Sequence, residues 1–229
     1  MLLIATPVRG AAPLSGDVKF GYAESRARLA QMMPVSFMPT SVGFSCDIVR
    51  ARNRIAAYVL RELPDVDRVF WWDDDVWPED LRLVQRMIDT GEDLIGLPYT
   101  NKKTPIRWVH QFLNERPQVR DNLLEVRGVG FGLTLTSRRC LEKLSASARQ
   151  YTDHPNPHKI ANLFGQLYDP PIEGSAESED DMLLSEDFSF CKRWRALGGK
   201  VLIYAGAGNM TTHAGPYGFS ARDMPGGLA

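Results

Sequence analysis

Long hydrophobic runs are absent from this sequence of 229 residues, and no apolar stretch approaches the ~20 residues that a membrane-spanning helix needs. The N-terminal stretch MLLIATPVRG has no basic region ahead of its apolar part, which is also too short for a signal peptide. We therefore interpret this stretch as a first β-strand and expect no integral membrane segment.

Cysteine is scarce as well. Cys46, Cys140 and Cys191 are scattered without CxxC spacing, so neither a disulfide framework nor a structural zinc site is indicated. This usage favours a reducing cytoplasm. The net charge of -1 provides no broad attraction to nucleic acid, although local arginines such as Arg138 and Arg139 could contact phosphates.

Short apolar runs rich in β-branched and aromatic residues recur along the chain, with helical patterns between several of them. They are LLIAT, VSFM, RVFWW, DLIGLP, GLTLT and KVLIYA. This alternation predicts an α/β fold in which a mostly parallel sheet is covered by helices. Folds of this kind often form around one continuous core at this size, so we expect a single domain over residues 1–229.

Helical periodicity and end signals predict the main helices. The clearest covers residues 47–63, a second follows from about 78 to 89 with Pro78 in its first turn, and a third covers 186–197. A weak helix is expected near 158–164.

Two further segments have patterns of their own. Residues 104–136 carry the alternating stretches IRWVHQFL and LLEVR, closed by GVGFG, and these predict a small antiparallel sheet. Residues 145–182 are rich in Pro, Ser, Asp and Glu, which is typical of a long loop that serves as a lid or stays disordered.

An acidic triplet, Asp73, Asp74 and Asp75, follows directly on the hydrophobic strand in RVFWWDDDVWPEDL. Mutual repulsion and desolvation disfavour three adjacent carboxylates there unless a cation is present. Alternate residues of an extended segment point the same way, so we expect Asp73 and Asp75 to face one site. Mg²⁺ or Mn²⁺ binds through one or two carboxylates together with phosphate oxygens. A solvated acidic entry to the next helix explains the triplet equally well.

Four segments in this order resemble the GT-A glycosyltransferases, specifically the family-two-like bacterial and phage members. They are LLIATPVRG, VRARNRIAAYVL, FWWDDDVWPEDL, and LSEDFSFCKRWRALGGKV leading to THAGPYG. The resemblance implies a Rossmann-like nucleotide-binding half over residues 1–103 and an acceptor-binding and catalytic half over 104–229. It also implies a metal-dependent hexosyltransferase that uses a nucleotide-sugar, with a UDP-linked sugar as the expected donor.

The resemblance assigns the metal ligands. Asp73 and Asp75 correspond to the DxD pair, with Asp75 as a direct ligand of Mn²⁺ or Mg²⁺, and His213 corresponds to the third protein ligand of many members. A lone histidine is also often structural.

The catalytic pair by resemblance is Glu186 and Asp187, similar to the Glu-Asp of inverting members in which the Asp deprotonates the acceptor hydroxyl. The same residues also suit a helix start, because Ser185 can cap the helix and acids in its first turn complement the helix dipole.

The resemblance also implies a set of donor-binding residues at the end of the first strand, in the "RN" pair of the following helix, in the acidic run and in PYTNKK. The set comprises Thr6, Pro7, Arg9, Arg52, Asn53, Asp73, Asp74 and Lys103. Arginine can pair with a phosphate through two parallel hydrogen bonds, and Lys102 or Lys103 could offset the charge of a diphosphate. Arg50, Arg52 and Arg54 alternate around a helix, so at least one should be solvated.

Acceptor-binding residues are expected at Trp108, His110, Gly130 and Phe131, because GVGFG resembles the glycine turn beside the acceptor. The acceptor is a hydroxyl-bearing molecule, and relatives act on polysaccharides, proteins or hydroxymethylated DNA bases. FCKRW resembles the signature of processive members, but Phe190 stands where those have Gln, which favours a single-transfer enzyme.

Other functions remain open. A haloacid-dehalogenase-like phosphatase also uses a strand-end DxD, but Trp77 stands where that class has a small Thr or Val. A nucleotidyltransferase would share the sheet and the paired acids, although TPVRGAAP lacks its glycine-rich fingerprint. The third alternative is a non-catalytic nucleotide- or sugar-binding module.

Overall fold

A computed structural model describes residues 1–7, 16–39, 42, 45, 47–153, 158–169, 182–206, 211–215 and 218–220, with 16–20 and 218–220 described by their backbone alone. The helices are α1 (Gly16–Met32), α3 (Ile48–Glu62), α4 (Arg82–Asp89), α5 (Arg138–Ser147) and α6 (Glu186–Ala196). The strands are β1 (Leu2–Ala5), β2 (Val35–Phe37), β3 (Arg68–Trp72), β4 (Val76–Pro78), β5 (Leu94–Gly96), β6 (His110–Phe112), β7 (Leu123–Val129), β8 (Leu133–Ser137), β9 (Gln150–Thr152), β10 (Lys159–Ala161), β11 (Tyr168–Asp169), β12 (Met182–Leu183), β13 (Leu202–Tyr204), β14 (Thr211–Ala214) and β15 (Gly218–Ser220).

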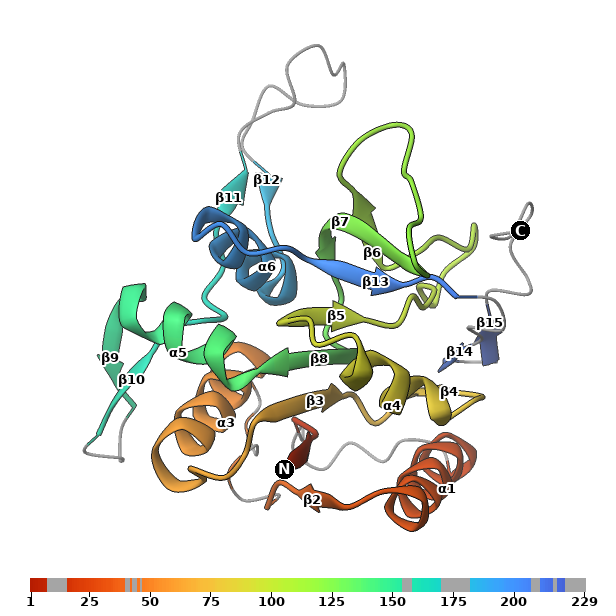
Figure 1. Cartoon of the computed structure of the whole chain (residues 1–229), viewed down its shortest axis with the longest axis horizontal. Helices are drawn as coiled ribbons and strands as arrows, with labels where there is room; N and C mark the ends of the chain where they lie inside the picture. The colour runs from red at the N-terminus through yellow and green to blue at the C-terminus, as the bar shows by residue number, and fades with distance from the viewer. Residues whose placement is uncertain are drawn as a thin grey trace.

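The central sheet has eight strands in the order β2-β1-β3-β8-β5-β13-β7-β6 (Figure 1). Strands β7 and β8 run against the direction that the other strands share. The sheet is therefore mixed but mostly parallel in direction, as the sequence predicts. The antiparallel pair β6 and β7 does not form a small sheet of its own, because β7 also pairs with β13 and so extends the central sheet.

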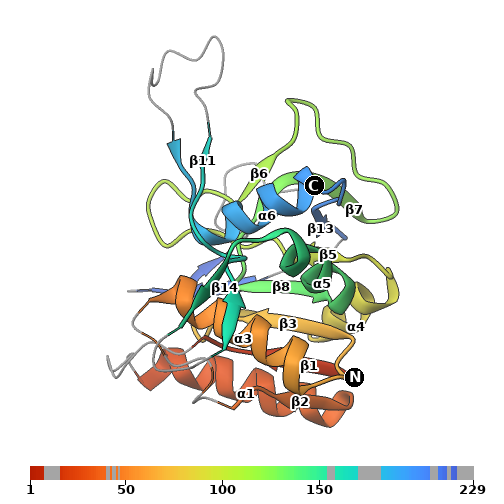
Figure 2. The same cartoon turned by 90° about the vertical axis from the view of Figure 1, so that its left-hand side faces the viewer.

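Buried residues form one cluster on each face of the sheet. Successive side chains of β3 alternate between them, since Val69 and Trp71 belong to one cluster and Phe70 and Trp72 to the other. The first cluster is covered by α3, α5 and α6, which Figure 2 shows on one side of the sheet, and the second by α1 and α4. This three-layer arrangement explains why β3 is hydrophobic at every position except its first.

Helices α3 and α6 lie where the sequence predicts them. Asp47 caps α3 by accepting a hydrogen bond of 2.9 Å from the backbone N–H of Val49. The helix expected from Pro78 is wrong at its start: residues 76–78 form β4, and α4 begins at Arg82. The weak helix expected near 158–164 is also wrong, because residues 159–161 pair with β9 as β10.

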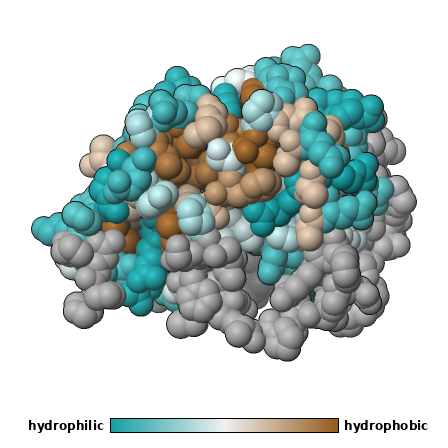
Figure 3. Space-filling view, turned by 90° about the horizontal axis from the view of Figure 1, so that it is seen from below, coloured by the Kyte–Doolittle hydropathy of each residue, from teal (hydrophilic) through white to brown (hydrophobic). Residues whose placement is uncertain are grey.

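Figure 3, which views the molecule from below, shows an apolar area on this face. The edge strand β2 ends in the exposed Phe37, and Met1 and Met32 are also exposed. None of the helices in the described part of the chain has the length and apolar character that crossing a membrane requires.

Candidate active site

The acidic triplet lies in a turn that joins β3 to β4. This is the carboxyl end of a strand in the middle of the sheet, where open α/β sheets bind ligands. Asp74 and Asp75 are in the turn itself, so the segment is not extended. Asp73 pairs with Arg52, whereas Asp75 pairs with Lys102 and His213, so the two carboxylates have different partners. They still interact, because the charge of Asp75 contributes to the raised pKa of Asp73.

Asp75 lies beside His213. The antiparallel pairing of β14 with β4 sets His213 opposite Val76, and the backbone N–H of Ala214 donates to the carbonyl of Asp75 at 2.7 Å. The His213 Nε2 is consequently 3.6 Å from the Asp75 Oδ1. The other oxygen, Oδ2, forms an ion pair with Lys102. Burial alone would raise the pKa of Asp75, but His213 and Lys102 outweigh it and lower the pKa below its ordinary value.

The orientation of His213 is fixed by its other ring nitrogen. Nδ1 lies 2.6 Å from the carbonyl oxygen of Thr100, so Nδ1 carries the hydrogen and donates. The edge of the ring packs on Tyr99, with ring centroids 5.2 Å apart. Nε2 therefore faces a carboxylate oxygen, a contact that is repulsive unless a proton or a cation lies between them.

Asp73 and Glu186 are joined by the buried Arg52. The guanidinium donates from Nη2 to Asp73 at 3.1 and 3.2 Å and from Nη1 to Glu186 at 2.8 Å. Its side chain is 3% exposed, yet Asp73, Glu186 and Asp187 outweigh the cost of burial and raise the pKa of Arg52. Burial raises the pKa of Asp73 despite the opposing effect of Arg52. Arg52 thus links the end of β3 to the start of α6.

Asp187 lies in the first turn of α6 and is partly buried. Its Oδ1 accepts hydrogen bonds from the Ser185 hydroxyl and from the backbone N–H of Phe188, the latter at 2.8 Å. Ser185 holds the N-cap position, but its side chain makes no capping bond to the helix backbone, so the expected cap is wrong. The hydroxyl instead fixes the Asp187 carboxylate.

The predicted three-residue ligand set is not assembled as expected. Asp75 and His213 are adjacent, whereas Asp73 is turned toward Arg52. Within the described residues, no three side chains of His, Cys, Asp or Glu are grouped so that they could hold a metal ion. Asp73 is instead engaged by the guanidinium of Arg52 on α3.

The predicted donor-binding residues gather in part. Thr6 shares a hydrogen bond with the hydroxyl of Tyr22 on α1, and the carboxylate of Asp74 is near that hydroxyl. Pro7 is buried next to Thr6, and Arg9 lies outside the described residues. Thr6 and Asp74 therefore lie on the α1 side of the turn, near Tyr22.

The two remaining donor-binding predictions are Asn53, which the structure does not support, and Lys103, which stays a prediction. Asn53 is 1% exposed; its amide donates to Asn162 at 3.0 Å and accepts from the Phe164 N–H at 3.0 Å, so it pins the segment after β10 to α3. A contact between Asn53 and a nucleoside does not fit this burial. Lys103 is exposed, and the ion pair with Asp75 is made by Lys102.

Two acceptor-binding predictions are also wrong. Phe131 is 0% exposed and packs on Trp71 and Phe190 in the core, so it cannot meet an acceptor. Gly130 is buried as well, and a Cβ there would lie 2.2 Å from the Tyr99 hydroxyl oxygen. The glycine is therefore required by the approach of Tyr99.

We expect Gly130→Ala to lower the free energy of unfolding by about 1–3 kcal/mol, the usual cost of overpacking a tight core. The new Cβ would push Tyr99 away from Gly132, whose N–H donates to the Tyr99 hydroxyl at 3.1 Å. Urea denaturation measures this. Combining Gly130→Ala with Tyr99→Phe should cost less than the sum of the single changes, and strict additivity would contradict the assigned clash.

The rings of Trp108, His110 and Phe112 pack one against the next, and the last two residues belong to the edge strand β6. Trp108 and His110 have ring centroids 5.6 Å apart, and those of His110 and Phe112 are 5.0 Å apart. His110 is 6% exposed, neither ring nitrogen has a hydrogen-bond partner among the described residues, and burial lowers its pKa to about 4. His110 is therefore neutral at pH 7, and Trp108 is the more accessible of the two predicted residues.

Three other sequence predictions concern residues away from the acidic turn. Arg138 donates to carbonyls at the end of α3 and beyond it, including that of Val66 at 2.8 Å, and Arg139 pairs with Asp93 at 2.6 Å. Both arginines are held by partners within the protein, so their positions are explained without a contact to phosphate. Phe190 is fully buried in the core, which explains an apolar residue at that position.

The sequence does not single out Tyr99 and Thr100, which contact His213, or distinguish Lys102 as the partner of Asp75. They follow β5, whose carboxyl end points to the same edge of the sheet as that of β3. The stretch PYTNKK after an apolar run was the available signal, but it could not tell Lys102 from Lys103.

Comparison of the sequence with models of known protein families and with curated proteins gives no match. Among solved structures, the fold is similar to that of A197 from STIV, with a TM-score of 0.53 and 17% sequence identity. The match covers 93% of this chain and 85% of that one. At this identity the similarity shows the fold alone.

Proposed function

We propose that this chain is a metal-dependent glycosyltransferase of the GT-A type that transfers a sugar from a nucleotide-sugar to a hydroxyl group. The observation that carries the proposal is the convergence of His213 on Asp75 at the carboxyl end of β3. These residues are far apart in the sequence, and the pairing of β14 with β4 brings an imidazole nitrogen to a carboxylate oxygen.

The chemistry of this pair fits a divalent cation. A histidine that binds a metal usually donates its other ring N–H to a carbonyl or carboxylate, as His213 does to Thr100. Ligand bonds of about 2.0–2.2 Å put neighbouring ligand atoms roughly 3 Å apart, close to the 3.6 Å observed. Asp75 and His213 would thus hold Mn²⁺ or Mg²⁺, and phosphate oxygens of the donor would complete its coordination.

When bound, such a cation would offset the negative charge that develops on the departing nucleoside diphosphate. Lys102, which pairs with Asp75, lies where its ammonium group can add to the same effect. Thr6 and Asp74 lie on the α1 side of the turn and would contact the nucleoside.

Asp187 is the residue we assign as general base. Its Oδ1 is held by Ser185 and by the backbone of Phe188, which leaves Oδ2 to take the proton of the attacking hydroxyl. Arg52 binds both Glu186, which precedes the proposed base, and Asp73, which precedes the proposed metal ligand Asp75 by two residues. It therefore holds the start of α6 in a fixed position relative to the turn after β3. With Asp187 as base, the transfer we propose is a single displacement with inversion.

The test incubates the purified chain with UDP-glucose, UDP-galactose or UDP-N-acetylglucosamine and Mn²⁺, and follows release of UDP. Slow hydrolysis of one donor is expected even without an acceptor, because water can replace the hydroxyl. Chelation with EDTA should stop it, and added Mn²⁺ should restore it. Phosphate release from a phosphomonoester, with every nucleotide-sugar left intact, would instead identify a phosphatase and refute the proposal.

A further inference from the structure

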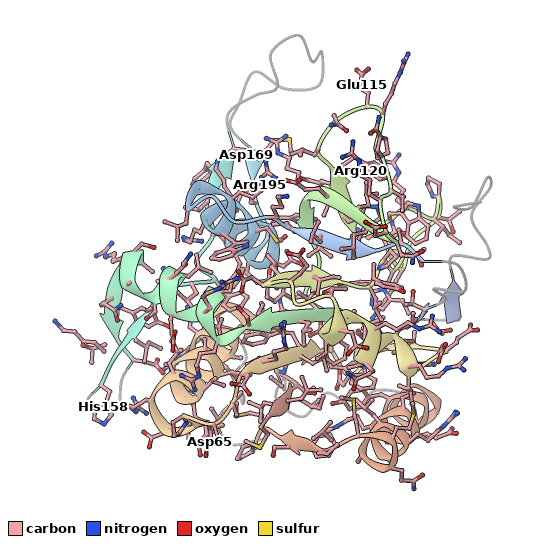
Figure 4. All side chains as sticks on the ribbon, in the orientation of Figure 1. Asp65, Glu115, Arg120, His158, Asp169 and Arg195 are labelled. Atoms are coloured by element: carbon pink, nitrogen blue, oxygen red, sulfur yellow. The ribbon has the colours of Figure 1, made fainter. Side chains whose placement is uncertain are left out.

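A pocket of about 330 Å³ lies between α6, β7 and the antiparallel strand pair β11 and β12. We call it the basic pocket; its walls include Arg127, Asp169, Phe188, Lys192 and Arg195. Figure 4 labels Asp169 and Arg195, whose side chains lie close together above α6. Apart from Phe188, whose backbone N–H binds Asp187, none of these residues belongs to the site described above.

Three of the wall residues are cations and one is an anion. The side chain of Asp169 is 12% exposed and forms ion pairs with two of the cations, with Arg127 at 3.3 Å and with Lys192. Arg195 is held loosely, since its Nη1 lies 3.7 Å from Glu125 and 3.4 Å from the carbonyl oxygen of Val126. The described wall residues therefore carry an excess of positive charge.

The cations remain reachable from solvent. The side chain of Arg127 is 45% exposed, that of Lys192 38% and that of Arg195 30%. Asp169 holds the first two at a fixed distance from each other, so their geometry is set before any ligand arrives. Guanidinium groups bind phosphate through paired hydrogen bonds, and an ammonium group adds a further point charge.

The pocket also has an apolar side. Phe188 lines it and packs so tightly on β7 that a Cβ at Gly128 would lie 2.2 Å from the phenylalanine ring. Leu113 and Leu184 complete this side. Inorganic phosphate gains nothing from an apolar wall, whereas the carbon skeleton of an organic phosphate can pack against it.

Helix α6 connects the pocket to the candidate base. Phe188, Lys192 and Arg195 are spaced four and three residues apart, so they share the helix face that lines the pocket. Asp187 precedes Phe188, and adjacent Cα atoms are about 3.8 Å apart. A molecule with a phosphate in the pocket could therefore present a hydroxyl around the first turn of α6.

We propose that the basic pocket binds a phosphate group of the acceptor, which makes the acceptor a phosphate-bearing molecule. The identity of the bound molecule as an acceptor rests on the proposed glycosyl transfer. The binding of phosphate to the pocket can be measured independently of that transfer. The phosphate could come from a small sugar phosphate or from the backbone of a nucleic acid.

The experiment titrates the full chain with inorganic phosphate by calorimetry at low salt. Arg127→Gln combined with Arg195→Gln should weaken binding at least 10-fold, because each charged hydrogen bond contributes about 1.5 kcal/mol or more. Asp169→Asn should strengthen binding, since it removes the competing carboxylate. Arg82→Gln is the matched control, because Arg82 also pairs with an aspartate but lies on α4, and it should change nothing.

A sugar phosphate and a single-stranded oligonucleotide, titrated in parallel, separate the two sources of phosphate. Tighter binding of the oligonucleotide, with a strong salt dependence, would identify a nucleic acid backbone. Equal phosphate binding by the wild-type chain and the folded double variant, or unchanged binding by Asp169→Asn, would overturn the proposal. Donor hydrolysis is measured on the same samples: its absence with phosphate binding intact would refute the transferase and leave the anion site standing.

Discussion

Replacing Arg52 with methionine is expected to lower the free energy of unfolding by about 3 kcal/mol. Breaking a buried ion pair by removing one partner costs about 3–5 kcal/mol, and the lower end applies because 31% of the Asp73 side chain and 18% of the Glu186 side chain are exposed. For a chain of this size, the melting temperature should fall by roughly 6–12 °C. Thermal unfolding followed by circular dichroism measures the shift.

The loss should also depend on pH. Burial already raises the pKa of Asp73 in the folded protein above 3.8, and Arg52 opposes that rise. Without Arg52 the folded pKa rises further, so the folded state binds more protons than the unfolded state and loses stability as pH increases through that pKa. The difference between wild type and Arg52→Met should therefore be smaller at pH 5 than at pH 8.

A suitable control is Arg82→Met. Arg82 pairs with Asp80, but its side chain is 71% exposed, so its removal should change the free energy of unfolding by no more than about 0.5 kcal/mol. Arg52→Lys should recover only part of the stability, because an ammonium group cannot bridge two carboxylates as a planar guanidinium does. Equal stability of Arg52→Met and Arg82→Met would show that the bridge between β3 and α6 is unimportant.

Asp75→Asn is expected to weaken Mn²⁺ binding and metal-dependent donor turnover by at least about 100-fold, because loss of a second-shell partner alone costs 10–100-fold. His213→Ala should have a similar effect, since its Nε2 lies 3.6 Å from the Asp75 carboxylate. Mn²⁺ affinity can be measured by calorimetry or by electron paramagnetic resonance, independently of any donor.

Asp80→Asn provides the control for this series. Asp80 lies five residues after Asp75 in the sequence, but its carboxylate pairs with Arg82 rather than with His213. The variant should bind Mn²⁺ like the wild type. If Asp75→Asn and Asp80→Asn bind Mn²⁺ equally well, Asp75 is not a ligand, and the pair with His213 is simply an ion pair with a protonated imidazole.

Much of the fold follows from local sequence. The apolar runs that form β1, β3, β5, β8 and β13 are short, β-branched or aromatic, and the cap at Asp47 fixes the start of α3. Helix α1 has no such signal, because the polar Ser25 lies between the buried Tyr22 and Leu29 on the part of the helix whose side chains are described. The three residues of β10 are too few to show a period, so local sequence does not distinguish this strand from a helix.

For the candidate site, the sequence by itself determined which chemical groups are present: an acidic run after a buried strand, a Glu-Asp pair at a helix start and a histidine in a glycine-rich tail. Only the tertiary structure decided how they are partnered. In the turn after β3, Asp73 and Asp75 have different partners. Arg52 binds both Asp73 and Glu186, and the register of β14 on β4 brings His213 to Asp75. These contacts join residues distant in sequence, and burial, which determines whether a side chain such as Phe131 or Asn53 can meet a ligand, depends on how all layers of the fold pack together.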